Sequence, residues 1–307
     1  MWKHFLCVIS FVILIGNLTA CHRSEKLISV SLPDKAPVTL TPYGNLSFSP
    51  INESSGLVKS RLWSNVFWTH NDSGDEPRIF PVKRDGSILK PEWAEEYAGI
   101  KIKDAVNIDW EDIATDNDGN LIIGAFGNNA NTRRDLAIYL VKEPFPSQTI
   151  ATRVSLKIPF YYPDQESIPP KNRNFDAEAV FWAKGKIYVL TKHRSDNFTK
   201  LYRLDSVDPF EPNPLTLTGI FDIKGQVTGA DASPDGNRLA VLTYSAVWLF
   251  EVSGSSDEYF NGKITWLPIE AKQCEGICFD GNKLMISNEQ RDLFELPIDS
   301  LIVIRDE

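Results

Sequence analysis

Cysteine, histidine and methionine are scarce in this chain of 307 residues, with 4, 4 and 2 copies respectively. Cys7 and Cys21 belong to the N-terminal segment, which leaves Cys274 and Cys278 for the rest of the chain. If these two lie on one strand, about 13 Å separates them, which is beyond the reach of a disulfide. We therefore expect two small buried apolar side chains and a fold that no disulfide holds. With 42% hydrophobic residues, the chain can bury a core of its own.

Several catalytic motifs are missing from the sequence. There is no Gly-x-Ser-x-Gly elbow, no phosphate-binding glycine-rich loop and no His-Glu-x-x-His. The stretch Asp116-Asn117-Asp118-Gly119 is superficially similar to a calcium loop, but its glycine comes too early and Gly127 stands where the closing Glu belongs. We predict a hairpin turn there.

Positive charge is in short supply, with 32 Lys and Arg against 41 Asp and Glu and a net charge of −9. An acidic surface of this size argues against nucleic acid and against anionic lipid headgroups as partners. It is compatible with divalent cations.

No apolar run is long enough to span a membrane. The run from Phe5 to Gly16 has about 12 residues, whereas a spanning helix needs about 20, so it predicts a signal segment after Lys3. It leads into Leu18-Thr19-Ala20-Cys21, which resembles the bacterial lipobox, in which cleavage precedes a cysteine that is then acylated. The alternative is an ordinary signal peptide with a chance cysteine.

The domain organisation follows from this segment. We predict a lipoprotein signal peptide at 1–20, a tether at 21–26 that is lipid-anchored through Cys21, and a single domain at 27–307. His22 follows the cysteine in place of the Asp that is typical of inner-membrane retention, so the outer membrane is the expected location. Two or more acyl chains give stable anchoring to a membrane.

The remainder of the sequence contains an internal repeat. Each unit opens with an acidic residue followed by small and apolar residues, and the openings begin at Glu53, Glu111, Glu178, Asp231 and Glu275. Turns and runs of β-branched and aromatic residues follow, without long helical periodicity, which indicates an all-β fold. Four strands per unit of roughly 40–55 residues are typical of β-propeller blades.

We count five units between Asn52 and Glu307, and the last lacks a clear fourth strand. The N-terminal stretch Leu27–Ser49 is the expected closing strand, which would leave no long unpaired edge. A six-bladed ring is the alternative, with a degenerate blade hidden in Leu27–Ser49 and the longer loops. The predicted fold class is thus an all-β propeller closed by its N-terminal strand.

The repeated acids carry the first hypothesis about chemistry. First strands of blades line the central channel, so we expect a ring of carboxylates made of Glu53, Glu111, Glu178, Asp231 and Glu275. Such a ring needs a cation or partial protonation, and oxygen ligands suit Ca²⁺ or Mg²⁺. Two alternatives remain open: the acids accept backbone N–H groups from neighbouring blades, or they bind a ligand directly.

The ends of the second strands carry the second hypothesis. Unlike the acids, these positions differ from unit to unit, as the points of a binding site do, and they should cluster at one mouth of the channel. The candidate ligand-binding residues are Asn71, Asp72, Asn128, Arg133, Lys192, Arg194, Asn288 and Glu289. Their positive members suit an anionic group. His193 and His70 are the candidate catalytic bases, with an ordinary hydrogen-bonding role as the alternative.

Several of these motifs together resemble a known bacterial set. They are Asn71-Asp72-Ser73-Gly74, Asp109-Trp110-Glu111-Asp112-Ile113-Ala114, Gly124 to Asn129 with Arg133, Glu143-Pro144, Asp176-Ala177-Glu178-Ala179 and Thr191-Lys192. The set resembles a group of exported propeller proteins with NDSG, DWEDIA, GDxGDN and DAEA signatures. It is more loosely similar to SdiA-regulated and phytase-like (esterase-like) propellers, which implies a propeller and, from the phytase-like relatives, calcium-assisted phosphoester hydrolysis.

One departure from the group bears on catalysis. This chain has Ala125 and Asn128 where the group has aspartates, so two potential carboxylate ligands are missing. We therefore expect a monomeric binding module for a small anionic ligand or a protein partner, with either Ca²⁺ or no cofactor supporting the site. The alternative is a metal-dependent hydrolase of phosphoesters or lactones, and a third possibility is a structural envelope lipoprotein. Whether the chain is an enzyme stays open at this point.

Overall fold

The computed structural model describes residues 26–306, so the predicted signal segment and Cys21 lie outside the described residues. Within this range the chain is all-β, as predicted, with two 3₁₀ turns, η1 (Tyr259–Asn261) and η2 (Ile298–Ser300), and no α-helix. No helix among residues 26–306 has the length and apolar character needed to cross a membrane.

Antiparallel pairing groups most of the strands into four-stranded units. Unit 1 contains β4 (Ser54–Lys59), β5 (Phe67–Asn71), β6 (Arg78–Val82) and β7 (Ile100–Lys103). Unit 2 contains β8 (Ile113–Thr115), β9 (Asn120–Ala125), β10 (Ala137–Lys142) and β11 (Ala151–Tyr161). Unit 3 contains β12 (Asp176–Ala183), β13 (Lys186–Lys192), β14 (Thr199–Leu204) and β15 (Asn213–Phe221).

The C-terminal half continues the pattern. Unit 4 contains β16 (Val227–Ala232), β17 (Arg238–Thr243), β18 (Ala246–Glu251) and β19 (Lys263–Glu270). Unit 5 contains β20 (Cys274–Asp280), β21 (Lys283–Asn288) and β22 (Asp292–Pro297), and its fourth strand is β3 (Gly44–Asn45) from the N-terminal stretch. The final strand, β23 (Ile302–Arg305), pairs with β19.

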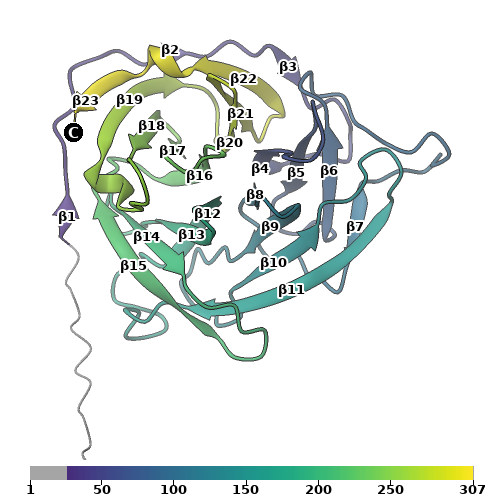
Figure 1. Cartoon of the computed structure of the whole chain (residues 1–307), viewed down its shortest axis with the longest axis horizontal. Coiled ribbons are helices and arrows are strands. Elements are labelled where there is room, and N and C mark those ends of the chain that lie inside the picture. Colours follow the sequence, from purple (N-terminus) through teal and green to yellow (C-terminus); the bar gives the residue numbers. More distant parts are fainter. Residues whose placement is uncertain (1–25, 307) are drawn as a thin grey trace, which may run out of the picture.

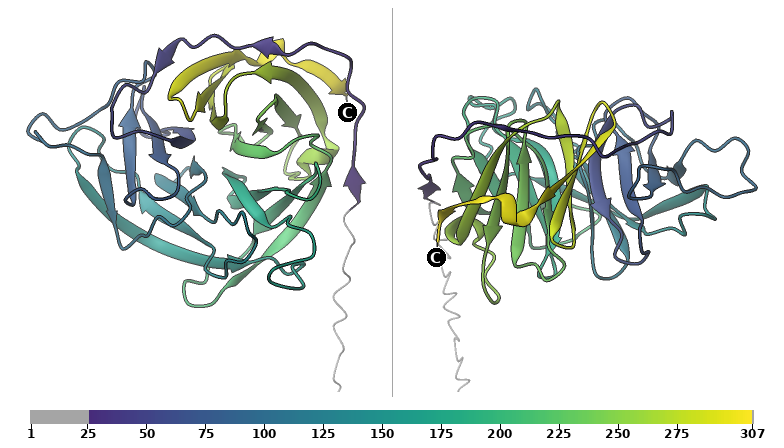
Figure 2. Two further views of the ribbon diagram at one scale, coloured as in Figure 1. Left: turned by 180° about the vertical axis from the view of Figure 1, so that it is seen from behind. Right: turned by 90° about the horizontal axis from the view of Figure 1, so that it is seen from above.

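The units stand around a common centre, an arrangement typical of β-propellers (Figure 1). The first strands are innermost, and each contacts the first strand of the next unit, including β20 with β4. Seen edge-on, the strands run between two faces of the molecule (Figure 2). Each unit's second strand therefore ends at the face on which its first strand begins.

The N-terminal stretch lies along the outside of this arrangement (Figure 1). β1 (Leu27–Ile28) pairs in parallel with β15, and β2 (Val38–Thr39) pairs in parallel with β19. Only β3 pairs antiparallel, with Leu293 opposite Gly44. Leu46, directly after β3, is fully buried in a cluster with Leu293 and Met285, so this stretch contributes to the core.

Apolar side chains fill the space between neighbouring units. Phe181 and Trp248 are fully buried in a cluster between units 3 and 4, and Trp68 and Trp110 in one between units 1 and 2. Cys274 and Cys278 are buried free thiols, as the sequence predicted. This packing fixes the inner strands, and hence the side chains at the two mouths of the centre.

Candidate functional site

The candidate site is a hollow at the face where the inner strands begin. Its volume is about 220 Å³. We call it the acidic mouth, and it is lined by Ser55, Asp72, Ser73, Asp109, Glu111, Asn129, Glu178, Lys192, Arg194, Tyr244, Glu275 and Glu289. All five units contribute side chains to it.

A bulge near the start of the inner strand places the acids. In β12 the pairing with β13 skips Glu178, and in β20 the pairing with β21 skips Glu275. An extra residue in a bulge breaks the alternation of the strand and re-aims its side chain. The equivalent position is Glu111 in unit 2, where the backbone N–H donates to the Gly124 carbonyl.

The predicted ring of five acids is therefore corrected to three acids and two hydroxyls. The bulge position of unit 1 holds Ser55, and that of unit 4 holds Thr228. Glu53 precedes the bulge and is exposed. Asp231 follows it, lines a hollow at the opposite mouth, and accepts a hydrogen bond from Phe279 N (2.9 Å).

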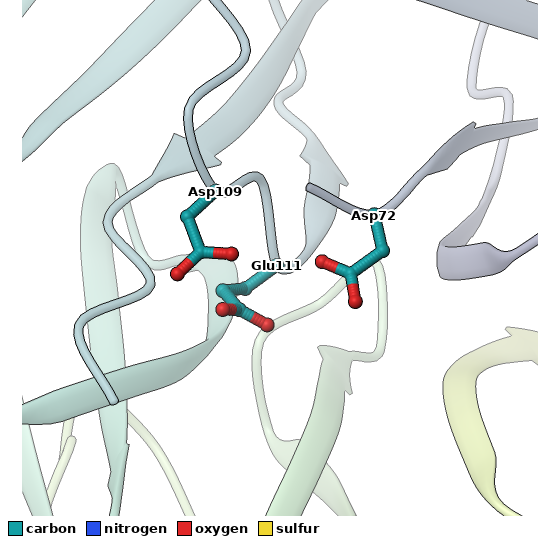
Figure 3. Close-up of side chains that lie close together, drawn as sticks. All are labelled: Asp72, Asp109 and Glu111. Carbon is teal, nitrogen blue, oxygen red and sulfur yellow. The ribbon is translucent and has the colours of Figure 1, made fainter. Parts of the chain in front are cut away.

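Two groups of carboxylates meet at Glu111. Oxygens of Asp72, Asp109 and Glu111 all lie within 4.8 Å of one another, and these side chains converge in Figure 3. Oxygens of Glu111, Asp176 and Glu178 satisfy the same limit. We call the first set the outer triad and the second the inner triad.

Glu111 is a buried member of the mouth whose carboxylate has no compensating partner among residues 26–306. The residue is only 7% exposed. Among residues 26–306 its carboxylate receives neither a hydrogen bond nor an ion pair, and the same is true of the Asp109 carboxylate. A buried charge without a partner is costly, so these two side chains need either a proton or a cation.

The carboxyl groups respond to this environment. Burial raises the pKa of Asp109 to about 6, and Asp72 and Asp176 add to the shift. Burial, reinforced by Glu178, raises the pKa of Glu111 well above its usual range. These are the shifts expected where carboxylates crowd together in a dry site.

The carboxyl groups on the other side of the mouth also have raised pKa values. Burial raises the pKa of Glu178 to about 7, although Lys192 opposes the shift. Burial raises the pKa of Glu275 to about 8, again against Lys192. Glu289 has a raised pKa for the same reason, burial.

The basic residues of the mouth are already engaged. Lys192 Nζ lies 3.1 Å from Glu178 Oε1 and donates to Tyr244 Oη at 3.1 Å. Arg194 pairs with Asp176 Oδ2 at 2.7 Å and with Glu178 Oε1 at 3.2 Å. Arg133, which the lining of the mouth does not include, pairs with Asp135 and donates to the Gly127 carbonyl. A bound anion would therefore compete with the carboxylates of Asp176 and Glu178 for the predicted contact with Lys192 and Arg194.

Gly127 brings the backbone against the outer triad. A Cβ atom at this position would lie 1.9 Å from Glu111 Oε1 and 2.4 Å from Asp109 Oδ2. Its N–H donates to the Asp109 carbonyl at 3.1 Å, which holds the two segments together. Only glycine leaves room for both carboxylates here.

Three asparagines that the sequence predicted as ligand-binding residues instead accept hydrogen bonds from backbone N–H groups of the loops. Asn71 Oδ1 accepts from Asn52 N, and Asn128 Oδ1 accepts from Thr132 N and Arg133 N. Asn288 Oδ1 accepts from the backbone N–H of Asp292. None of the three lines the acidic mouth, whereas the predicted residues Asp72, Lys192, Arg194 and Glu289 do.

The two candidate histidines also lie outside the lining of the mouth. His70 is fully buried, with Nδ1 2.9 Å from the Asn71 carbonyl, and packs edge-on against Trp110. His193 Nδ1 lies 2.6 Å from Asp196 Oδ1. Burial lowers the pKa of both imidazoles, so each is neutral near pH 7. Neither is placed to act as a base on a molecule bound in the mouth.

Sequence reasoning missed Asp109 and Asp176 as site residues. Each stands two positions before a bulge acid, in Asp109-Trp110-Glu111 and Asp176-Ala177-Glu178. Residues i and i+2 of an extended segment share a face, so the spacing itself predicts paired carboxylates. That signal is present in units 2 and 3, the units that supply the inner triad.

No protein-family model and no curated protein matches this chain. Among solved structures, it is similar to a chain of a nidogen/laminin complex (TM-score 0.44, 12% identity, covering 82% of this chain and 79% of that one). It is also similar to a chain of Kuenenia stuttgartiensis hydrazine synthase (TM-score 0.40, 9% identity, 80% and 71%). A third is a chain of a mitotic checkpoint complex (TM-score 0.38, 12% identity), where 78% of this chain matches 62% of that one. Likeness at this level carries no argument about activity or partners.

Proposed function

We propose that this chain is an exported, lipid-anchored, five-bladed β-propeller whose acidic mouth binds one divalent cation of the Ca²⁺ class. Through that cation it would hold an anionic group of a small ligand or of a protein partner. The single observation that carries the proposal is the outer triad of Asp72, Asp109 and Glu111, three converging carboxylates with no positive partner among residues 26–306.

The blade count rests on strand pairing. Each unit supplies an antiparallel set, and β3 completes the last one opposite β22. The contact of β20 with β4 joins the last inner strand to the first. A sixth blade would need a further inner strand between these two.

The choice of cation rests on ligand chemistry. Carboxylate oxygens are hard ligands, and crowded acids with irregular geometry suit Ca²⁺ better than the strict octahedron that Mg²⁺ demands. Asp72, Asp109 and Glu111 would hold the ion, and the Ser55 hydroxyl lies on the same lining. The ion would supply the positive charge that Glu111 and Asp109 lack.

Binding is favoured over hydrolysis. The hydrolase expected from the sequence would use His70 or His193 as its base, and both histidines lie outside the mouth. Because Lys192 and Arg194 are paired internally, an anion would reach this mouth chiefly through the cation's open coordination positions. The resemblance to the NDSG/DWEDIA group is consistent with an exported binding protein.

Cation binding is tested by thermal melting. The full chain, purified in detergent and stripped with EDTA, is melted at pH 7.5 in increasing Ca²⁺, Mg²⁺ or Mn²⁺. A ligand at 100 times its Kd stabilises a protein by about 2.7 kcal/mol, so a specific site should raise the Tm by several degrees. Unchanged melting with all three ions would overturn the proposal. The Tm shift should be retained in Asp118→Asn, which loses one acid from an exposed hairpin turn outside the site.

The anchor has a separate test. In a bacterial host, the wild-type chain should fractionate with the outer membrane, and Cys21→Ala should appear in the soluble fraction or stay unprocessed. Equal fractionation and equal processing of the two would overturn the anchor and leave the cation site untouched.

A further inference from the structure

We propose that the guanidinium of Arg194 occupies the second of two cation positions that share Glu111. The acidic mouth then takes a single divalent cation, and removing Arg194 opens a second position. This inference rests on the proposed cation binding and specifies its stoichiometry.

The contacts of Arg194 place its charge within the inner triad. Its Nη2 lies 2.7 Å from Asp176 Oδ2 and 3.2 Å from Glu178 Oε1, and its Nε donates to Asp176 Oδ2 at 2.8 Å. The guanidinium thus contacts two of the three acids whose oxygens lie within 4.8 Å of one another. A metal ion bound to the inner triad would need these same oxygens.

Charge balance separates the two triads. Asp176 and Glu178 carry two negative charges, which the positive charges of Arg194 and Lys192 match through direct ion pairs. The outer triad has no ion pair among residues 26–306. A first divalent cation is therefore attracted to the outer triad, where no positive side chain of residues 26–306 is paired with the acids.

The shared residue links the two positions. Glu111 is buried and its carboxylate receives no hydrogen bond from the described part of the chain, so it is available to either triad. A carboxylate has two oxygens and can contact two cations at once. In the native protein it would lie between the metal ion and the guanidinium.

Removing the guanidinium leaves Asp176 without an ion pair and Glu178 with Lys192 as its one ion-pair partner among residues 26–306. The side chains of Asp176 and Glu178 are 0% and 4% exposed, whereas that of Arg194 is 25% exposed and projects from the segment after β13. Breaking one side of a buried ion pair is strongly unfavourable unless another positive charge or a proton replaces it. A second divalent cation, bound by the oxygens that the guanidinium no longer contacts, would supply that charge.

The experiment counts ions. Bound Ca²⁺ is measured by equilibrium dialysis at pH 8 on the EDTA-stripped full chain in detergent, for wild type, Arg194→Met and Arg153→Met. Arg153 is exposed on β11 and provides a matched loss of charge. We expect one ion per chain for wild type and for Arg153→Met, and two for Arg194→Met. Adding Glu178→Gln to Arg194→Met should return the count to one.

The outcomes separate the two claims. No ion bound by wild type would overturn the proposed function itself. One ion bound by a folded Arg194→Met chain, or two by wild type, would overturn this inference alone. If Arg194→Met lacks a cooperative melting transition, Arg194→Gln takes its place, because glutamine retains hydrogen-bond donors towards Asp176. Arg194→Gln should bind two ions per chain. A count of one ion would overturn the inference. Millimolar guanidinium should also compete with the second ion of the variant and not with the first.

Discussion

Asp112 Oδ2 accepts a hydrogen bond from the backbone N–H of Val180 at 3.0 Å, so a fully buried carboxyl group in unit 2 is tied to the inner strand of unit 3. The same oxygen lies 3.4 Å from Ala230 N in unit 4, and Oδ1 accepts from Ile113 N at 2.8 Å. One side chain therefore joins three inner strands directly beside the acidic mouth. This is the structural role that the sequence offered as an alternative for the repeated acids. Asp112, the neighbour of Glu111, has this role, and so does the repeated acid Asp231, which accepts from Phe279 N.

Asp112→Ala should destabilise the fold strongly. Leaving buried N–H groups without acceptors costs about 1–3 kcal/mol each, so we expect a total loss of about 2–4 kcal/mol in the free energy of unfolding. Urea denaturation with fluorescence detection gives the value. Asp118→Ala, on an exposed turn, should change stability by less than about 0.5 kcal/mol. Equal midpoints for the two variants would contradict the role of Asp112.

The cation-free chain should lose stability as the pH rises. Burial raises the pKa of Asp109 to about 6, of Glu178 to about 7 and of Glu275 to about 8. A carboxyl group whose pKa is higher in the folded state stabilises the fold fully below its unfolded pKa of about 4, and this contribution disappears as the pH passes the folded value.

The measurement is urea unfolding in EDTA at pH 5, 6, 7 and 8. Stability attributable to these groups should decline between about pH 5 and 8, and excess Ca²⁺ should reverse most of the decline at pH 8. Calcium affinity should rise over the same interval, because the ion displaces protons. A cation affinity that is independent of pH would contradict the assignment of these carboxyl groups to the site.

Gly127→Ala should abolish or greatly weaken cation binding. Its added Cβ would stand 1.9 Å from Glu111 Oε1, so the carboxylate must move away from Asp109. We expect at least a tenfold loss of affinity, about 1.4 kcal/mol, in calorimetric titration. Gly225→Ala is the matched control, since its Cβ would meet only ordinary contacts of 3.5 Å or more with Thr243. Wild-type affinity in Gly127→Ala would exclude the outer triad as the site.

If the N-terminal stretch completes the last unit, a substitution in that stretch should strongly reduce the stability of the fold. Leu46→Ala removes a fully buried side chain that packs on Leu293, and such changes cost about 2–5 kcal/mol. Leu27→Ala, where the side chain is 39% exposed, should cost much less. Thermal and urea unfolding of both variants makes the comparison, and a stable Leu46→Ala chain would mean that β3 is dispensable for the ring.

Strand pattern was the part of this protein that the sequence predicted well. The alternation of short β-branched runs and turns such as Asp118-Gly119 is set locally, so the all-β fold could be predicted without a structure. The fourth strand of the last unit, expected from Leu27–Ser49, is β3 at Gly44–Asn45.

The site was predicted less completely, because the position of a β-bulge cannot be recognised from residue types alone. Aligning the units by their acids placed Asp231 with Glu178, whereas strand pairing aligns Thr228 with it. Burial was equally invisible, since His70 and His193 look like catalytic residues until their neighbours are known. The D-x-E spacing, at Asp109 and Glu111 and again at Asp176 and Glu178, was the readable signal of paired carboxylates.

The most direct test of the central claim is calorimetric titration of Ca²⁺ into wild-type and Glu111→Gln chains at pH 8. Glutamine keeps the shape of the side chain and removes the charge that both triads share. The proposal predicts one ion per chain for wild type and an affinity at least tenfold weaker, by about 1.4 kcal/mol, for Glu111→Gln. No heat of binding to wild type, or equal affinity in both chains, would contradict it.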